Sequence, residues 1–106
     1  MSNKTTESLA NINSLEQGSL SVSGELGFKS VPMLYTSSLK FFQNSHNLDI
    51  DLAGVNHADS AGVALLIEWI RQARQQNRTI NFHNIPSQLL AIARLCGVAE
   101  MLSHQA

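Results

Sequence analysis

The residues best suited to chemistry gather in one segment, Asn56-His57-Ala58-Asp59-Ser60-Ala61-Gly62. It lies where an alternating run gives way to a helical one, and the functional loops of open α/β sheets lie at such carboxyl ends of strands. A serine in the first turn of a helix is exposed beside free backbone amides, which would stabilise a phosphoryl group on its oxygen. Ser60 is therefore the candidate phosphorylation residue. A phosphate beside Asp59 would repel a partner that fits the unmodified hydroxyl.

The same segment also has a purely structural interpretation. Asp59 or Ser60 can accept hydrogen bonds from the orphan amides of a helix start, and capping alone would explain both residues. A capping box needs Glu or Gln three residues after the cap, and Gly62 or Val63 stands at that position, which rules out a capping box. Nucleophilic catalysis by Ser60 would need a base, and His57 is close in sequence, but no Gly-x-Ser-x-Gly elbow surrounds the serine. We therefore expect no catalytic residue and no enzymatic activity.

The histidines and glycines indicate no cofactor. The four histidines lie far apart, without cysteine or carboxylate partners at ligand spacing, so we expect no metal site. They are His46, His57, His83 and His104. The glycines form neither a dinucleotide fingerprint nor a Walker A loop. We expect no cofactor of any kind.

Composition excludes several classes of partner. Hydrophobic residues make up 43% of the 106 residues and charged residues 14%, which is typical of a globular domain. The net charge of −1 leaves no cationic field for nucleic acid or an anionic bilayer. The apolar run at residues 63–67 is too short to cross a bilayer, and residues 1–7 lack the apolar stretch of a secretory signal. We expect a cytoplasmic protein with no nucleic-acid partner and no direct membrane insertion.

Several single residues have a plain structural interpretation. Cys96 is the only cysteine, and its place in the apolar run 89–96 predicts a small core residue. Trp69 lies at the border of an apolar stripe, where core packing is the usual role, although an exposed position would make it a partner anchor. Arg71, Arg74 and Arg78 form either a basic edge or, by default, a solvated helix face.

Hydrophobic periodicity predicts the elements that position the segment. Alternation predicts strands at residues 20–26, 48–52 and 79–83. At residues 9–15 the apolar residues are three apart, an ambiguous pattern that we interpret as a short edge strand. Helical spacing predicts helices at 31–43, 60–76 and 89–96, with a final turn at 98–102. Pro32 and Pro86 are typical of helix starts, and Gly97 of a helix end. Residues 53–59, which are small and polar, are predicted to form a loop.

This order of elements predicts an α/β fold. The first two strands form a hairpin, and the later strands, separated by helices, need parallel crossovers. The result is a mixed sheet of four to five strands, an N-terminal hairpin followed by βαβαβα, covered by helices. We expect residues 1–7 to be a flexible tail and residues 8–106 to be a single domain.

The chain resembles the STAS family, the domain shared by sulfate transporters and anti-sigma factor antagonists. Three stretches carry the resemblance and span nearly the whole chain after residue 15. They are Gly24-Glu25-Leu26, residues 48–55 followed by Asp59-Ser60-Ala61-Gly62, and residues 85–98 with Ile85-Pro86 and Cys96-Gly97-Val98. The resemblance implies the STAS fold.

Within the family, the chain is most similar to the STAS subunits of Mla-type phospholipid ABC transporters. Gly24-Glu25-Leu26-Gly27-Phe28, Val31-Pro32 and residues 59–69 carry this likeness. It implies a non-catalytic adaptor that binds the cytoplasmic ATPase subunit of the transporter, within its permease complex at the inner membrane. Such a subunit supports assembly and activity in the lipid transport that maintains outer-membrane asymmetry. The implied contact residues are Asp59, Ser60, Ala61, Gly62, Ala64, Leu65 and Arg71.

The alternative is an anti-sigma factor antagonist. In that branch the serine that matches Ser60 is phosphorylated, and the protein cycles between a kinase-bound and a phosphorylated state. Antagonists usually carry an aspartate two residues after Gly-Glu, whereas this chain carries Gly27. This departure favours the transporter subunit.

Overall fold

The computed structural model describes residues 10–16, 18–43 and 45–103, so the predicted tail at residues 1–7 lies outside the described residues. Within these ranges four strands and four helices follow one another, and every predicted strand and helix is present. The strands are β1 (Ala10–Glu16), β2 (Ser19–Leu26), β3 (Asn47–Ala58) and β4 (Thr79–His83). The helices are α1 (Val31–Phe42), α2 (Ser60–Gln75), α3 (Ser87–Leu95) and α4 (Ala99–Ser103).

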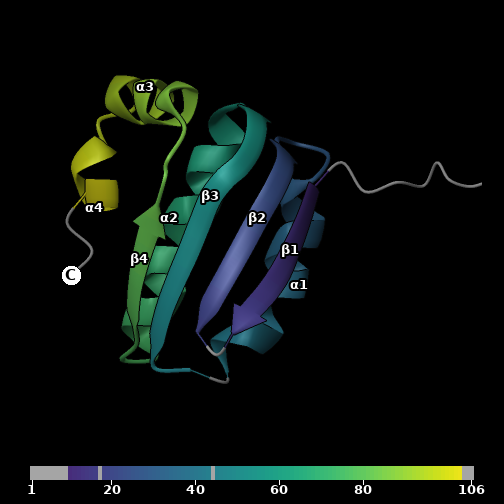
Figure 1. Cartoon of the computed structure of the whole chain (residues 1–106). Helices are drawn as coiled ribbons and strands as arrows, with labels where there is room; N and C mark the ends of the chain where they lie inside the picture. Colours follow the sequence, from purple (N-terminus) through teal and green to yellow (C-terminus); the bar gives the residue numbers. More distant parts are fainter. Residues whose placement is uncertain (1–9, 17, 44, 104–106) are drawn as a thin grey trace, which may run out of the picture.

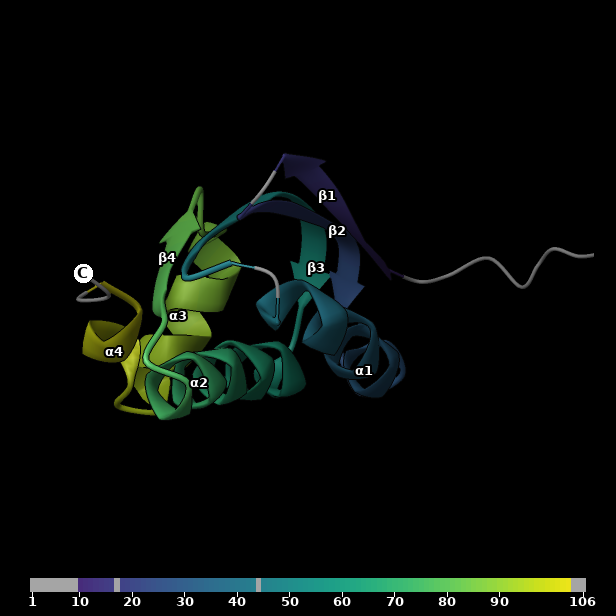
Figure 2. The same ribbon diagram turned by 90° about the horizontal axis from the view of Figure 1, so that it is seen from below.

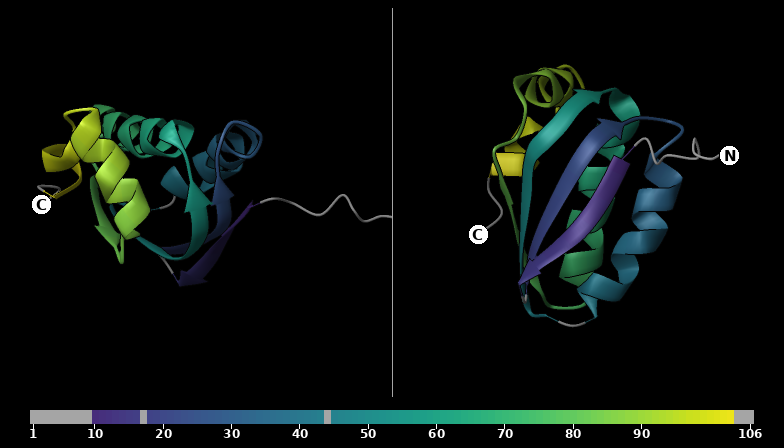
Figure 3. Two further views of the ribbon diagram at one scale, coloured as in Figure 1. Left: turned by 90° about the horizontal axis from the view of Figure 1, so that it is seen from above. Right: turned by 45° about the vertical axis from the view of Figure 1, so that its right-hand side comes forward.

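The strands form one sheet in the order β1-β2-β3-β4 (Figure 1). β1 runs antiparallel to β2, which confirms the predicted hairpin. β3 lies between β2 and β4 and is parallel to both, which confirms the predicted crossovers. α1 and α2 lie side by side on one face of the sheet (Figure 2). α3 lies at the end of the sheet where β2 and β3 end (Figure 3). Among the described residues, no helix covers the opposite face.

The core lies between the sheet and the helices. Alternation in β2 buries Leu20, Val22 and Leu26 and turns the intervening serines to the uncovered face. Trp69 is fully buried, with its ring 6.5 Å from that of Phe42 and from that of Phe82, so the prediction of core packing is confirmed. The other large, fully buried side chains are Phe42, Leu20, Leu26, Leu34, Leu48, Ile50, Leu52, Leu65, Leu66, Ile70 and Leu89.

The predicted loop at residues 53–59 is wrong, because β3 continues to Ala58. Ser21 pairs with Asp51 and Ser23 with Gly54, so β3 holds one residue more than β2 at this point, and a second register shift follows between Gly24 and Glu25. Such bulges break the two-residue period of a strand. The buried positions become Leu52, Val55 and Ala58, three residues apart. This part of the strand therefore lacks the alternation by which a strand is predicted.

The prediction that Cys96 is a core residue is also wrong, because its side chain is exposed. α3 buries Leu89 and Ala93, and it ends at Leu95, which is 89% exposed. The spacing from Ala93 to Cys96 continues the buried face, but Cys96 is the C-cap, where the backbone leaves the helix toward Gly97. Gly97 has a φ of 77°, as expected for the residue after a helix end.

Candidate functional site

Asp59 is the cap of α2. Its backbone is extended, with φ −124° and ψ −166°, and its Oδ1 accepts a hydrogen bond of 2.8 Å from the backbone N of Ala61. The backbone N of Asp59 donates in turn to the carbonyl oxygen of Leu26, at 3.0 Å. The end of β2 and the start of α2 are thereby joined. Of the two capping residues that the sequence allowed, Asp59 is the cap, and Ser60 is the first residue of the helix.

One face of α2 is exposed along its length. Ser60, Ala64 and Arg71 are exposed, and they follow one another at spacings of four and seven residues, which keeps them on one side of a helix. Glu68 lies between them and pairs with Arg71, Oε1 to Nη1, at 2.9 Å. Ala61 is half-buried beside Ser60. The helix therefore presents a serine and an alanine at its start and an ion pair further on.

Gly62 and Leu65 face inward. Leu65 is 2% exposed, and a Cβ at Gly62 would lie 2.9 Å from both the carbonyl oxygen and the Cβ of Leu26. It would also lie 3.3 Å from the side chain of Leu89 on α3. Of the seven predicted contact residues, five therefore lie at the surface. Gly62 and Leu65 lie beneath it.

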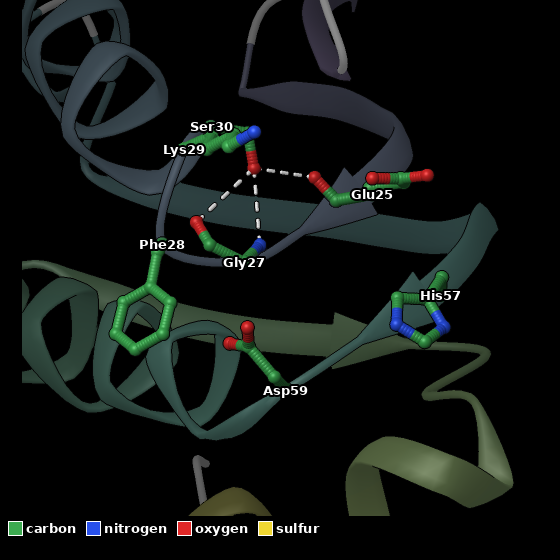
Figure 4. Close-up of a pocket in the computed structure, with 7 residues that line it drawn as sticks. All are labelled: Glu25, Gly27, Phe28, Lys29, Ser30, His57 and Asp59. Carbon is green, nitrogen blue, oxygen red and sulfur yellow. Dashed lines mark hydrogen bonds between the residues drawn. The ribbon is translucent and has the colours of Figure 1, made fainter.

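A hollow of about 270 Å³ opens beside the start of α2, at the carboxyl ends of β2 and β3 (Figure 4). Its lining is mixed in charge: Glu25, Gly27, Phe28, Lys29, Ser30, His57 and Asp59. Ser30 is buried, and its Oγ accepts a hydrogen bond of 3.0 Å from the backbone N of Gly27 and donates to the carbonyl oxygen of Glu25. The β2–α1 turn, residues 27–30, is thus held firmly next to the helix start.

Gly27 lies directly against the cap. A Cβ at this position would lie 2.9 Å from Asp59 Oδ2, so a larger side chain would displace the carboxylate that caps α2. At the position where antagonists carry an aspartate, a side chain in this protein would therefore require the Asp59 carboxylate to shift.

Among the described residues, no side-chain hydrogen bond joins His57 to Ser60, although both are exposed, His57 near the end of β3 and Ser60 at the start of α2. The described part of the chain also holds no group of three or more His, Cys, Asp and Glu side chains that could bind a metal ion. None of the helices in that part is both long and apolar enough to cross a bilayer.

The family model described as "Mlab, STAS domain" matches residues 12–103, which is most of the chain. The chain belongs to this STAS family. The intermembrane phospholipid transport system binding protein MlaB of Haemophilus influenzae is 33% identical over 54 residues. These residues are 51% of this chain and 51% of that protein, so the STAS domain matches about half the length of the relative.

Two solved structures are similar to the STAS domain. A chain in the Acinetobacter MlaFEDB complex, in an ATP-bound conformation, is 30% identical, with a TM-score of 0.68 over 79% of this chain and 90% of that chain. The anti-sigma factor antagonist SpoIIAA in its unphosphorylated form has the same TM-score of 0.68, over 86% of this chain and 83% of its own, at 13% identity. The second match shows the shared fold, which confirms the predicted STAS architecture.

The uncovered face of the sheet carries a cluster of polar side chains that was not predicted. Parallel pairing sets Asp51 opposite His83, and His83 Nε2 lies 3.0 Å from Asp49 Oδ1. The sequence spacing of the histidines did not indicate this pair, because residues 34 apart in sequence meet across two strands. The amide of Asn84 donates to Asp51 Oδ1 at 3.0 Å and the backbone N of Ala53 donates at 2.9 Å. These bonds, with a smaller effect of His83, lower the pKa of Asp51.

Arg78 and Arg74 differ in their surroundings. Arg78 donates to Gln76 Oε1 at 2.8 Å and to the carbonyl oxygen of Ser45, so it fastens the α2–β4 turn to the segment before β3. Arg74 is exposed, as the interpretation of a solvated helix face expects.

Proposed function

We propose that this STAS domain is a non-catalytic adaptor subunit of an Mla-type phospholipid ABC transporter, docked on the cytoplasmic ATPase subunit by the exposed face of α2. Docking supports assembly and activity of the transporter in the intermembrane lipid transport that maintains outer-membrane asymmetry. The protein is then cytoplasmic and held at the inner membrane through its partner complex. The proposed contact residues are Asp59, Ser60, Ala61, Ala64 and Arg71, with Gly62 and Leu65 packed beneath them.

The observation that carries this proposal is the 30% identity, over 79% of this chain, to a chain solved inside the Acinetobacter MlaFEDB complex. The surface chemistry of α2 supports it. Ser60 and Ala64 have short side chains, so a partner can approach the helix closely without ordering long flexible groups, which would oppose binding through lost entropy. The cap at Asp59 fixes the first turn before the partner arrives.

The test is direct binding of the full chain to the purified ATPase subunit of the transporter. Ser60→Glu places a charge and Ala64→Arg a long side chain on the exposed face, and each should weaken binding at least about tenfold. The matched controls lie on α3: Ser87 is the exposed first residue of that helix, and Ala91 is an exposed alanine. Ser87→Glu and Ala91→Arg should keep the dissociation constant within about twofold of the wild type. Full binding by both α2 variants would reject the proposal.

The second candidate is a signalling antagonist regulated by phosphorylation of Ser60. The exposure of Ser60 at a capped helix start favours it, because a phosphate there would meet backbone amides. Mass spectrometry after incubation with candidate kinases tests this function, and a chain that never gains phosphate on Ser60 would exclude it.

A further inference from the structure

Phe28 stands out among the aromatic side chains of the described chain. It is 76% exposed, whereas Tyr35, Phe41, Phe42, Trp69 and Phe82 are buried or half-buried. Burying a phenylalanine stabilises a protein by roughly 1.5–3 kcal/mol relative to leaving it in water. The fold of the isolated chain gains little from this ring, which leaves the ring available to a partner.

The β2–α1 turn holds Phe28 in a defined place. The buried Ser30 Oγ binds both the backbone N of Gly27 and the carbonyl oxygen of Glu25. The backbone N atoms of Ser30 and Val31 both donate to the carbonyl oxygen of Gly27, at 3.1 and 2.9 Å. An exposed ring on a fixed turn loses little conformational freedom on binding, and this favours its use as an anchor.

The turn and the start of α2 form one continuous surface. Gly27 lies close to the Asp59 carboxylate, 2.9 Å from Oδ2 if a Cβ were added, and the backbone N of Asp59 donates to the carbonyl oxygen of Leu26. Phe28 and Asp59 line the same hollow (Figure 4). A partner that covers the exposed face of α2 therefore meets Phe28 at the edge of the same contact.

We infer that Phe28 is the aromatic anchor of the docking surface, inserting its ring into an apolar pocket of the ATPase subunit. This inference rests on the proposed function and names an aromatic contact residue for it. Glu25 and Lys29, both exposed, line the same hollow as Phe28 and supply polar groups of the kind that surround such anchors in protein interfaces.

The test measures the dissociation constant of the full chain and the purified ATPase subunit for four proteins: wild type, Phe28→Ala, Phe28→Leu and Leu95→Ala. Phe28→Ala should weaken binding at least about tenfold, and Phe28→Leu should fall between the alanine variant and the wild type. Leu95 is the control, because it is 89% exposed at the end of α3. Its alanine variant should bind as the wild type does. Thermal unfolding of Phe28→Ala should match the wild type, since the ring is mostly in solvent.

Two outcomes overturn the anchor and leave the docking proposal standing. In the first, the wild type binds, Ser60→Glu binds weakly, and Phe28→Ala binds as tightly as the wild type. In the second, ATPase binding is unchanged and the alanine variant alters only self-association of the free chain, so that a second copy covers the ring. If the wild type itself does not bind the ATPase subunit, both proposals fail.

Discussion

The indole Nε1 of Trp69 donates a hydrogen bond of 2.8 Å to Ser38 Oγ, which joins α2 to α1 inside the core. Both side chains are fully buried. Ser38 in turn donates to the carbonyl oxygen of Tyr35 at 2.6 Å, so the one hydroxyl satisfies a donor from α2 and keeps its own bond within α1. The packing of α1 against α2 on one face of the sheet thus includes a polar contact that is buried from water.

Ser38→Ala should destabilise the protein by about 1–3 kcal/mol, because it leaves the buried indole N–H without an acceptor. Urea unfolding at equilibrium measures the change. Ser37→Ala, at the neighbouring half-buried position, is the control and should change stability by no more than about 0.5 kcal/mol. Equal losses for the two variants would show that the indole bond contributes nothing.

Asp59→Ala should destabilise the protein by about 1 kcal/mol through loss of the cap, whereas Asp59→Asn should keep most of the stability because its amide oxygen can still accept from Ala61. Thermal unfolding of both variants measures the difference. If asparagine proves as harmful as alanine, the negative charge at the start of α2, and not the capping bond, provides the stability.

Gly62→Ala should destabilise the protein by about 1–3 kcal/mol, although alanine is the better helix former. The added Cβ would lie 2.9 Å from the carbonyl oxygen of Leu26, so α2 would have to move away from the end of β2. Chemical denaturation measures the effect. A gain of about 1 kcal/mol, as expected for glycine to alanine in an exposed helix, would contradict the close contact.

Asp51 should make stability depend on pH in the acid range. Its pKa is lowered in the folded state, chiefly by the bond from Asn84, so the carboxylate stabilises the fold at pH values above its unfolded pKa, near 4. That stability is lost as the pH falls through the folded value. The difference in unfolding free energy between wild type and Asp51→Asn should therefore be constant from about pH 5 to 7 and shrink below about pH 4.

A second variant checks the cause of this pH dependence. Asn84 has a φ of 58°, so Asn84→Gly removes the amide donor without straining the backbone. The pH dependence attributed to Asp51 should then become smaller. An identical difference at pH 3 and pH 6 in the first experiment would contradict the lowered pKa.

The start and length of α2 were predictable, because Asp59 has the chemistry of a cap and the apolar stripe has a helical period. The burial of Leu65 was not. α2 contacts α1, α3 and α4 as well as the sheet, and these contacts with other helices widen its buried face beyond the stripe that faces the strands. Sequence spacing shows which residues share a helix face, but not how many neighbours that helix will have.

The same limit applies to Phe28 and to the pair formed by His83 and Asp49. Phe28 contributed to the family resemblance, but no spacing in the sequence shows that a turn would hold its ring in water. His83 meets its carboxylate only through the parallel register of β3 and β4. The exposed face at the start of α2 could be predicted, whereas its aromatic neighbour could be found only from the structure.

The two extra residues in β3 have a consequence for insertions and deletions. Each bulge shifts which side chains point into the core, and after the second one Ala58 faces inward just before the cap at Asp59. Deleting one residue in this part of the strand would turn the following side chains to the opposite face and rotate the start of α2 relative to the β2–α1 turn. Homologues that keep this surface should therefore vary in residue type between Leu52 and Asp59 while keeping the number of residues constant.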